Sequence, residues 1–230
     1  KVDSEYPDNK LTGATFEVYK DSNATGNLDD GDELLGTLTE KEIGEYSMND
    51  LFYGRYFVKE TKAPEGFVLD TGVYEVMIDT NGKTYKVENK AGVGFVNDAM
   101  RGNLKIIKTS SDGKVKGFAF RITGANGYDI ILETNDKGEI FIDGLRIGDY
   151  TISEVSNSAS SMYVIPADKK ATVKIGSTTI VEMHNVLRDT PKTGDTTNLP
   201  LLYALAGLSA VGIAVCGVIG FKKKKKEDRN

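Results

Sequence analysis

The chain has almost no cysteine: its 230 residues include a single one, Cys216, which lies inside an uncharged C-terminal run. A disulfide in the rest of the chain is therefore excluded, and so are a cysteine-ligated metal site and a cysteine nucleophile there. Histidine is equally scarce, with His184 as the only one, and the sequence shows no Ser-His-Asp set, phosphate-binding loop or histidine-rich ligand cluster. None of these common signatures of enzymes or metal centres is present.

Outside the C-terminus, acidic residues outnumber basic ones. The formal net charge is −5, and the last nine residues, with five Lys, one Arg, one Glu and one Asp, contribute +4, so the rest of the chain carries −9. An acidic body of this kind argues against nucleic acid as a partner. The chain also lacks an N-terminal signal peptide and starts on Lys1, so we interpret it as the C-terminal piece of a longer protein.

One long uncharged run is present, at residues 199–221. As a helix rising about 1.5 Å per residue it spans about 30 Å or slightly more, which matches the hydrocarbon thickness of a membrane. Lysines at 222–226 follow it directly, and an excess of positive charge marks the cytoplasmic side. A buried core helix is disfavoured because the run is terminal and has no polar face. We therefore predict a transmembrane helix at 199–221, a basic cytoplasmic tail at 222–230 and an extracellular body.

Helical periodicity is lacking before residue 199. Short segments rich in β-branched or aromatic residues recur instead, and pairs such as Asn81-Gly82 and Asp112-Gly113 between them are typical of hairpin turns. The pattern predicts an all-β region built as β-sandwiches. The expected strands are residues 15–19, 56–60, 74–78, 104–108, 118–122, 130–132, 139–142, 150–154 and 171–175.

Two copies of one unit make up this region. LFYGRYFVKE at 51–60 and LRIGDYTISE at 145–154 carry Leu, Gly, Tyr and Glu at the same offsets. Each copy also has an early strand, GATF or GFAF, and closes on an apolar strand that ends in Asn, GFVN or VEMHN. The boundary falls near Met100, so we expect domain one at 1–100 and domain two at 101–188.

Period-two alternation places polar side chains on the apolar face of several strands. In domain two, Lys108 shares a face with Leu104 and Ile106, and the glutamate and asparagine of the repeat also follow apolar residues. Buried ionisable groups are costly unless they are paired or neutralised, so these positions need an explanation. The alternation predicts two buried sets: Lys1, Glu60 and Asn97 in domain one, and Lys108, Glu154 and Asn185 in domain two.

The segments KVDSEYPDNKLTGATFEVY, YFVKETKAPEGF and GFVNDA resemble the SpaA/Cna B-type (prealbumin-like) domain of Gram-positive pilins and adhesins. The resemblance covers nearly all of residues 1–188 and implies two tandem Ig-like/prealbumin-like β-sandwiches, the first with a truncated first strand. In that family a Lys on the first strand and an Asn on the last strand form an intramolecular isopeptide bond, with a Glu as catalyst. Carried over, the resemblance gives isopeptide residues Lys1, Asn97, Lys108 and Asn185 and catalytic residues Glu60 and Glu154. Domain two departs from the family pattern where SEVSNSASSMYVIP replaces the ETKAPEGF stretch.

The burial of these groups agrees with that chemistry. Desolvation lowers the pKa of a lysine and raises the pKa of a glutamate, so an apolar core favours the neutral pair. The neutral amine is a nucleophile, and the protonated glutamate can donate to the asparagine oxygen while ammonia leaves. The resulting cross-link would do for a cysteine-free ectodomain what a disulfide does elsewhere. The alternative is that each set is an unreacted buried salt bridge or faces solvent.

The C-terminal stretch DTPKTG, the uncharged run and the basic tail together resemble a cell-wall sorting signal of the LPxTG type. Thr190 stands where the family usually has Leu, and Pro191, Lys192, Thr193 and Gly194 complete the motif. The resemblance implies that a sortase cleaves between Thr193 and Gly194 and passes Thr193 to an amine of a peptidoglycan precursor or a neighbouring pilin. A chance Pro-x-Thr-Gly before an ordinary membrane anchor is the alternative. Residues 189–198 then serve as motif and linker.

A calcium site is a further candidate. Asp21, Asn23, Thr25, Gly26 and Asp32 fall at positions 1, 3, 5, 6 and 12 of a calcium-binding loop, with Thr at position 5 and Asp at position 12 as departures. A solvated acidic hairpin explains the same residues. No other cofactor is expected.

The leading functional interpretation is a structural one: a wall-anchored pilin subunit or adhesin stalk whose only chemistry is self-cross-linking. We expect it outside the cell, after a transient stage in the plasma membrane with its C-terminus cytoplasmic. Two alternatives remain open, a module that binds a host surface ligand and a wall anchor for an enzyme domain located upstream.

Overall fold

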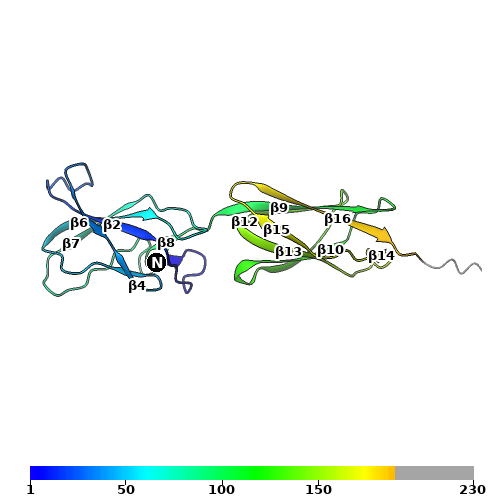
Figure 1. The fold of residues 1–230 in the computed structure, drawn as a ribbon, viewed down its shortest axis with the longest axis horizontal. Coiled ribbons are helices and arrows are strands. Elements are labelled where there is room, and N and C mark those ends of the chain that lie inside the picture. The colour runs from blue at the N-terminus through cyan, green and yellow to red at the C-terminus, as the bar shows by residue number, and fades with distance from the viewer. Residues whose placement is uncertain (190–230) are drawn as a thin grey trace, which may run out of the picture. The chain divides into compact units, whose positions relative to one another are not determined.

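The computed structural model describes residues 1–189 (Figure 1). The predicted sorting motif at 190–194, the predicted transmembrane run at 199–221 and the basic tail at 222–230 lie outside the described residues. Within residues 1–189 no helix is long and apolar enough to cross a membrane, and the one helical element is a short 3₁₀ turn at Ala125–Gly127. The all-β prediction is therefore confirmed for the part of the chain that the structure describes.

Domain two, the region of strands β9 to β16, is a sandwich of two four-stranded sheets. In the first sheet β9 lies between β12 and β16, and it pairs antiparallel with β12 and parallel with β16. The first and last long strands of the domain are therefore neighbours (Figure 1). The first sheet contains β12 (Glu139–Arg146), β9 (Arg101–Ser110), β16 (Thr178–Leu187) and β14 (Tyr163–Val164). The second contains β11 (Asp129–Glu133), β10 (Ala119–Thr123), β13 (Gly148–Val155) and β15 (Lys169–Val173).

An apolar core fills the space between these two sheets. It takes alternate residues of the central strands, such as Leu104 and Ile106 of β9 and Ile152 of β13, all of which are fully buried. Burial of each such side chain stabilises the fold by about 2 kcal/mol relative to exposure. The alternation continues along the same strands to Lys108 and Glu154, which are also buried. Polar side chains therefore lie at one end of an otherwise apolar core.

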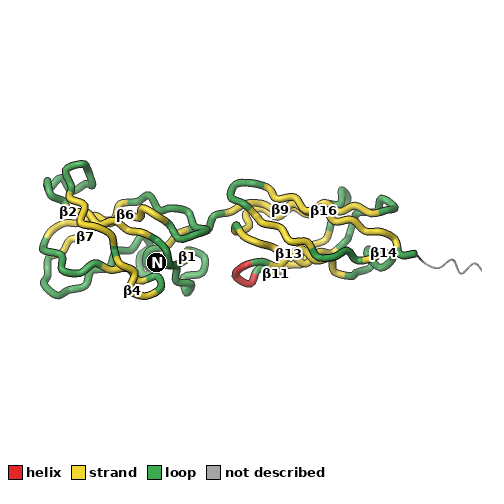
Figure 2. The backbone as a smooth tube through the Cα atoms, in the orientation of Figure 1, coloured by secondary structure: helices red, strands yellow, loops and turns green. Residues whose placement is uncertain are grey.

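Domain one, the region of β1 to β8, has one four-stranded sheet and two short strand pairs. Figure 2 shows that loops make up a larger share of this region than of domain two. Val93, directly before the expected GFVN strand, lies in a turn in which its backbone amide donates to the carbonyl of Lys90. The sheet contains β3 (Glu33–Thr37), β2 (Thr15–Lys20), β6 (Gly54–Lys62) and β7 (Val73–Ile78), and the pairs are β1 (Val2–Asp3) with β8 (Val96–Asn97) and β4 (Thr39–Glu42) with β5 (Glu45–Ser47).

The short β1–β8 pair keeps the register seen in domain two. Both pairings are parallel, and Asp3, two residues after Lys1, lies opposite Asn97. The corresponding pair in domain two is Ser110 and Asn185. Each domain therefore places its lysine and its asparagine on adjacent parallel strands with the same offset, although the sequences around them differ.

Candidate functional site

Three buried polar side chains meet in the core of domain two. Lys108 comes from β9 and Asn185 from its neighbour β16, whereas Glu154 comes from β13 in the facing sheet. Their relative exposures are 1%, 0% and 7%, respectively. The period-two geometry that builds the core from these strands also brings the three polar groups to one place.

The contacts of this set connect the asparagine directly to the glutamate. Asn185 donates a hydrogen bond of 2.6 Å from Nδ2 to Oε1 of Glu154. Nζ of Lys108 donates to the carbonyl oxygen of Thr109 at 2.5 Å and lies 4.1 Å from the ring centroid of Phe118. Oε2 of Glu154 and Oδ1 of Asn185 are buried without a hydrogen-bond partner. Two acceptors in the core of domain two thus have unused hydrogen-bonding capacity.

Burial moves the titration of both ionisable groups toward their neutral forms. Desolvation raises the pKa of Glu154, and the smaller opposing effects are the hydrogen bond from Asn185 and the charge of Lys108. Desolvation also lowers the pKa of Lys108, against weaker effects of Glu154 and Asp112. A neutral amine and a protonated carboxyl are the forms required of a nucleophile and of a general acid.

Domain one holds an equivalent set in which the glutamate bridges the other two groups. Nζ of Lys1 lies 2.8 Å from Oε1 of Glu60, as an ion pair between two fully buried side chains. Asn97 donates from Nδ2 to Oε2 of the same carboxylate at 2.8 Å. The lysine nitrogen also lies 4.4 Å from the ring centroid of Phe95. Desolvation lowers the pKa of Lys1, and the contact with Glu60 opposes that shift.

The loop after β6 supplies two further contacts that sequence reasoning missed. The carbonyl oxygen of Val68 accepts a 2.7 Å hydrogen bond from Nδ2 of Asn97, and the backbone amide of Asp70 donates to Oε2 of Glu60 at 2.9 Å. Because a carbonyl can only accept, Val68 fixes which side of the Asn97 amide carries the nitrogen. Oδ1 of Asn97 is consequently left buried and without a hydrogen-bond partner. The only sequence signal for this loop was its position directly after the APEGF segment.

Each lysine also packs its backbone against a glycine that was not singled out from the sequence. The amide of Lys108 donates to the carbonyl of Gly138 at 2.7 Å, and the amino nitrogen of Lys1 donates to the carbonyl of Gly44. Both glycines have positive φ, +76° and +75°, and a Cβ on either would lie 2.7 or 2.6 Å from the lysine carbonyl oxygen. The sequence repeat did contain a signal for these two glycines, because each lies sixteen residues before the glutamate of its own domain.

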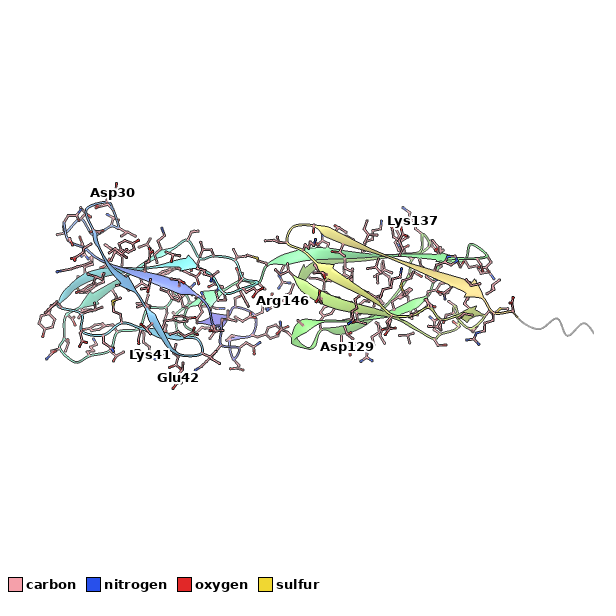
Figure 3. All side chains as sticks on the ribbon, viewed as in Figure 1. Asp30, Lys41, Glu42, Asp129, Lys137 and Arg146 are labelled. Carbon is pink, nitrogen blue, oxygen red and sulfur yellow. The ribbon has the colours of Figure 1, made fainter. Side chains whose placement is uncertain are left out.

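The four residues proposed for calcium, Asp21, Asn23, Thr25 and Asp32, lie in the exposed β2–β3 loop, whose Asp30 is labelled in Figure 3. The carboxylate of Asp21 accepts from the amides of Thr25 and Gly26 and pairs with Arg55 at 3.3 Å. The side-chain amide of Asn23 donates to the carboxylate of Asp29. The carboxylate of Asp32 accepts from the backbone amides of Ser22 and Asp29. Among the described residues no three His, Cys, Asp or Glu side chains are grouped to hold a metal ion. Internal hydrogen bonds account for these side chains, and the structure gives the calcium prediction no support.

The fold agrees with the resemblance to the SpaA/Cna B-type domain. The SpaA prealbumin-like fold domain family matches residues 1–91 and again residues 102–187. The chain therefore belongs to the SpaA prealbumin-like family, with two copies of its domain, and the family prediction is confirmed.

Individual relatives include a protein named for the bacterial surface and a pilus adhesin. The chain is 27% identical over 172 residues to the trypsin-resistant surface T6 protein of Streptococcus pyogenes serotype M6, covering 73% of this chain and 28% of that protein. The solved Bacillus anthracis TIE protein has a TM-score of 0.58 and 24% identity over 80% of this chain and 32% of that one. The pilus adhesin SpaC from Lactobacillus rhamnosus GG has a TM-score of 0.50 and 14% identity, covering 82% of this chain and 30% of that one. The chain spans less than a third of the length of each of these proteins.

Proposed function

We propose that each domain cross-links itself through an isopeptide bond, Lys1 to Asn97 in domain one and Lys108 to Asn185 in domain two. The observation that carries the proposal is the repetition of one arrangement. In both domains a buried carboxylate accepts a hydrogen bond from the asparagine amide, and a lysine of the adjacent parallel strand reaches the same core. Three buried ionisable or amide groups are costly for a small domain, and formation of a neutral amide removes that cost.

The proposed reaction balances with no external reagent. In domain one the ion-paired lysine transfers a proton to the glutamate. In domain two desolvation favours the neutral amine and the protonated carboxyl without direct contact between them. The neutral amine then attacks Cγ of the asparagine. The carboxyl of the glutamate contacts Nδ2 of the asparagine in both domains, which places it to protonate the leaving group. The glutamate then carries a proton from the attacking nitrogen to the amide nitrogen, the Cγ–Nδ2 bond breaks, and ammonia leaves. Positions fixed by the fold replace an otherwise unfavourable bimolecular encounter, and each domain reacts once.

The intact mass of residues 1–187 tests this proposal directly. We expect the purified protein to be lighter than its sequence by two molecules of ammonia. Glu60→Ala and Glu154→Ala should each be lighter by one, because each variant loses the proton carrier of a single domain. Peptide mapping should find Lys108 joined to Asn185 in Glu60→Ala, and Lys1 joined to Asn97 in Glu154→Ala. A parent protein with its full sequence mass would refute the proposal.

We further propose that the cross-linked domains form the wall-proximal part of a pilin subunit or adhesin stalk. The family, the surface location printed for the T6 relative, and the order of the C-terminal motif, uncharged run and basic tail support this assignment. Sortase would cleave between Thr193 and Gly194 and attach Thr193 to a peptidoglycan precursor or a neighbouring pilin. The same mass analysis, applied to protein released from the wall, should find a chain that ends at Thr193.

A further inference from the structure

A cluster of charged side chains joins domain two to the first strand of domain one, within the compact unit formed by residues 1–187. Its centre is Arg146, labelled in Figure 3, the last residue of β12. The guanidinium forms two hydrogen bonds with Asp3, of 2.6 Å from Nη1 to Oδ2 and 2.8 Å from Nη2 to Oδ1. It also pairs with Glu5 at 2.6 Å and lies 4.9 Å from the ring centroid of Tyr6. A bidentate pair of this kind fixes the orientation as well as the position of the carboxylate.

The carboxylate held by Arg146 lies next to the proposed reaction centre of domain one. Asp3 is 1% exposed, and Lys1 lies two residues earlier, directly before β1, so in an extended chain the two side chains lie on the same face. Directly opposite Asp3 on β8 is Asn97, whose carbonyl oxygen accepts from the amide of Ser4 at 3.1 Å. A shift of Asp3 along or away from β8 would therefore displace Lys1 from its partner.

Strand β1 has few other contacts that could set this register. Its ladder with β8 covers two residue pairs, whereas the equivalent ladder in domain two covers eight. Further main-chain bonds join Asp3 to Asn9 and Lys1 to Leu11, within the adjoining turn of the same segment, and the amino nitrogen of Lys1 to the carbonyl of Gly44. The side-chain bonds to Arg146 are thus an important external restraint on a short strand.

Arg146 itself is held firmly by domain two. Its backbone pairs with Arg101 at the end of the β12–β9 ladder, and its carbonyl accepts a 2.9 Å hydrogen bond from the hydroxyl of Tyr150. The next residue, Ile147, donates from its amide to the carbonyl of Met100, in the connection between the domains. By the offset that aligns the two repeats, the position of Arg146 is occupied in domain one by Phe52, which cannot bind a carboxylate.

We infer that Arg146 is a positioning residue for the cross-link of domain one: domain two holds Asp3, and through it the register of Lys1 against Asn97. The inference rests on the proposed Lys1–Asn97 bond. It makes bond formation in domain one depend on prior folding of domain two, whereas domain two reacts without assistance from domain one.

The test compares the rates of both bonds in one molecule. The unreacted chain of residues 1–187 is recovered in denaturant, refolded by dilution and quenched at intervals, and each bond is followed by peptide mapping. In Arg146→Gln the Lys1–Asn97 bond should form at least about tenfold more slowly than in the parent, since small misplacements of reacting groups have effects of that order. The Lys108–Asn185 bond should form at the parental rate. Arg121→Gln, which removes an exposed ion pair with Asp129 in domain two, is the matched control and should change neither rate.

A second variant separates positioning from the effect of an unpaired buried charge. Asp3→Asn combined with Arg146→Gln removes both charges, and it should remain slow in domain one if the bidentate contact sets the register. Recovery of the parental rate in the double variant would overturn the inference, as would an unchanged rate in Arg146→Gln or equal slowing of both bonds. A parent that forms neither bond would instead refute the proposed function.

Discussion

The two lysines are held in their cores by different means, although their surroundings share one plan. Lys1 forms an ion pair with Glu60, whereas the contacts of Lys108 are a backbone carbonyl and the ring of Phe118. In domain two the charged amine therefore lacks direct contact with Glu154, and desolvation dominates the pKa of both groups. Domain two is consequently the better place to observe how protonation controls bond formation.

The rate of bond formation in domain two should depend on pH with a single maximum. The reactive state needs Lys108 neutral, so the rate rises with pH through the lowered pKa of that amine. It also needs Glu154 protonated, so the rate falls again as pH rises through the raised pKa of that carboxyl. The maximum should lie between the ordinary values of 4.5 and 10.5. Refolding at a series of pH values, with acid quench and mass analysis, measures the profile.

Asn185→Ala, which cannot react, provides the control for this profile. Between 4.5 and the raised pKa of Glu154 the folded state of this variant binds more protons than the unfolded state, so its stability should fall as pH rises. Between the lowered pKa of Lys108 and 10.5 the folded state binds fewer protons, so stability should rise with pH. A rate profile that is flat across these ranges would contradict the assigned roles of the two groups.

The sequence was informative about five of the six polar residues because each ends an alternating apolar series, whereas Lys1 was placed by its position at the start of the chain. It was silent about Val68 and Asp70, because the contacts that they make with Asn97 and Glu60 come from backbone groups of a loop. A backbone donor or acceptor leaves no trace in residue identity, and the loop position depends on tertiary packing. Residue-level prediction therefore identified the buried polar side chains of the two sets but not the backbone groups that contact them.

At the scale of elements, the turn that leads into β12 packs directly against the backbone of β9, the first strand of its domain. Gly138 combines a φ of +76° with contact against the backbone of Lys108, and Gly113 has a similar φ of +80° with no atom near its missing Cβ. The two positions therefore separate the cost of a left-handed conformation from the cost of close packing.

Gly138→Ala should destabilise domain two considerably more than Gly113→Ala. The left-handed conformation alone costs an alanine about 1 kcal/mol in either position. At Gly138 the added Cβ must also displace the carbonyl of Lys108, so we expect a total loss of about 3 kcal/mol, in the upper range for a strained site. Denaturant unfolding of each variant measures the difference. Equal losses would show that the turn has room to relax and that the lysine backbone is not confined by it.

Strand prediction was most accurate where one face of a strand is buried. The expected strands at 104–108 and 150–154 fall within β9 and β13, whose alternate residues enter the core. The strands at Glu33–Thr37 and Thr39–Glu42 were not predicted, because they are largely exposed and carry no alternating pattern. Parallel pairing of the first and last strands was also beyond the sequence, since it joins segments at opposite ends of a domain.

At the scale of the whole molecule, the two cores are separate. The apolar cluster of domain two contains residues from 104 to 183, and the cluster of domain one contains residues from 16 to 95, with no member in common. Each proposed bond closes a loop within its own domain. Closing a loop of this length stabilises a domain by about 4 kcal/mol in the chain-entropy account of cross-links.

Loss of one bond should therefore lower one unfolding transition and leave the other in place. In calorimetry, Glu154→Ala should lower the transition of domain two, and Glu60→Ala that of domain one, each by the equivalent of about 4 kcal/mol. The assignment of each transition follows from which variant shifts it. A shift of both transitions in either variant would show that the domains unfold as one unit.

The parallel pairing of β9 with β16 also determines how domain two would carry a pulling force. Tension along the chain enters at the start of β9 and leaves at the end of β16, and Lys108 and Asn185 lie on these two strands. With the proposed bond in place, the load passes from one strand to the other through a covalent link. The polypeptide between the two residues then carries no tension, so the domain holds its length under forces that would extend an uncross-linked sandwich.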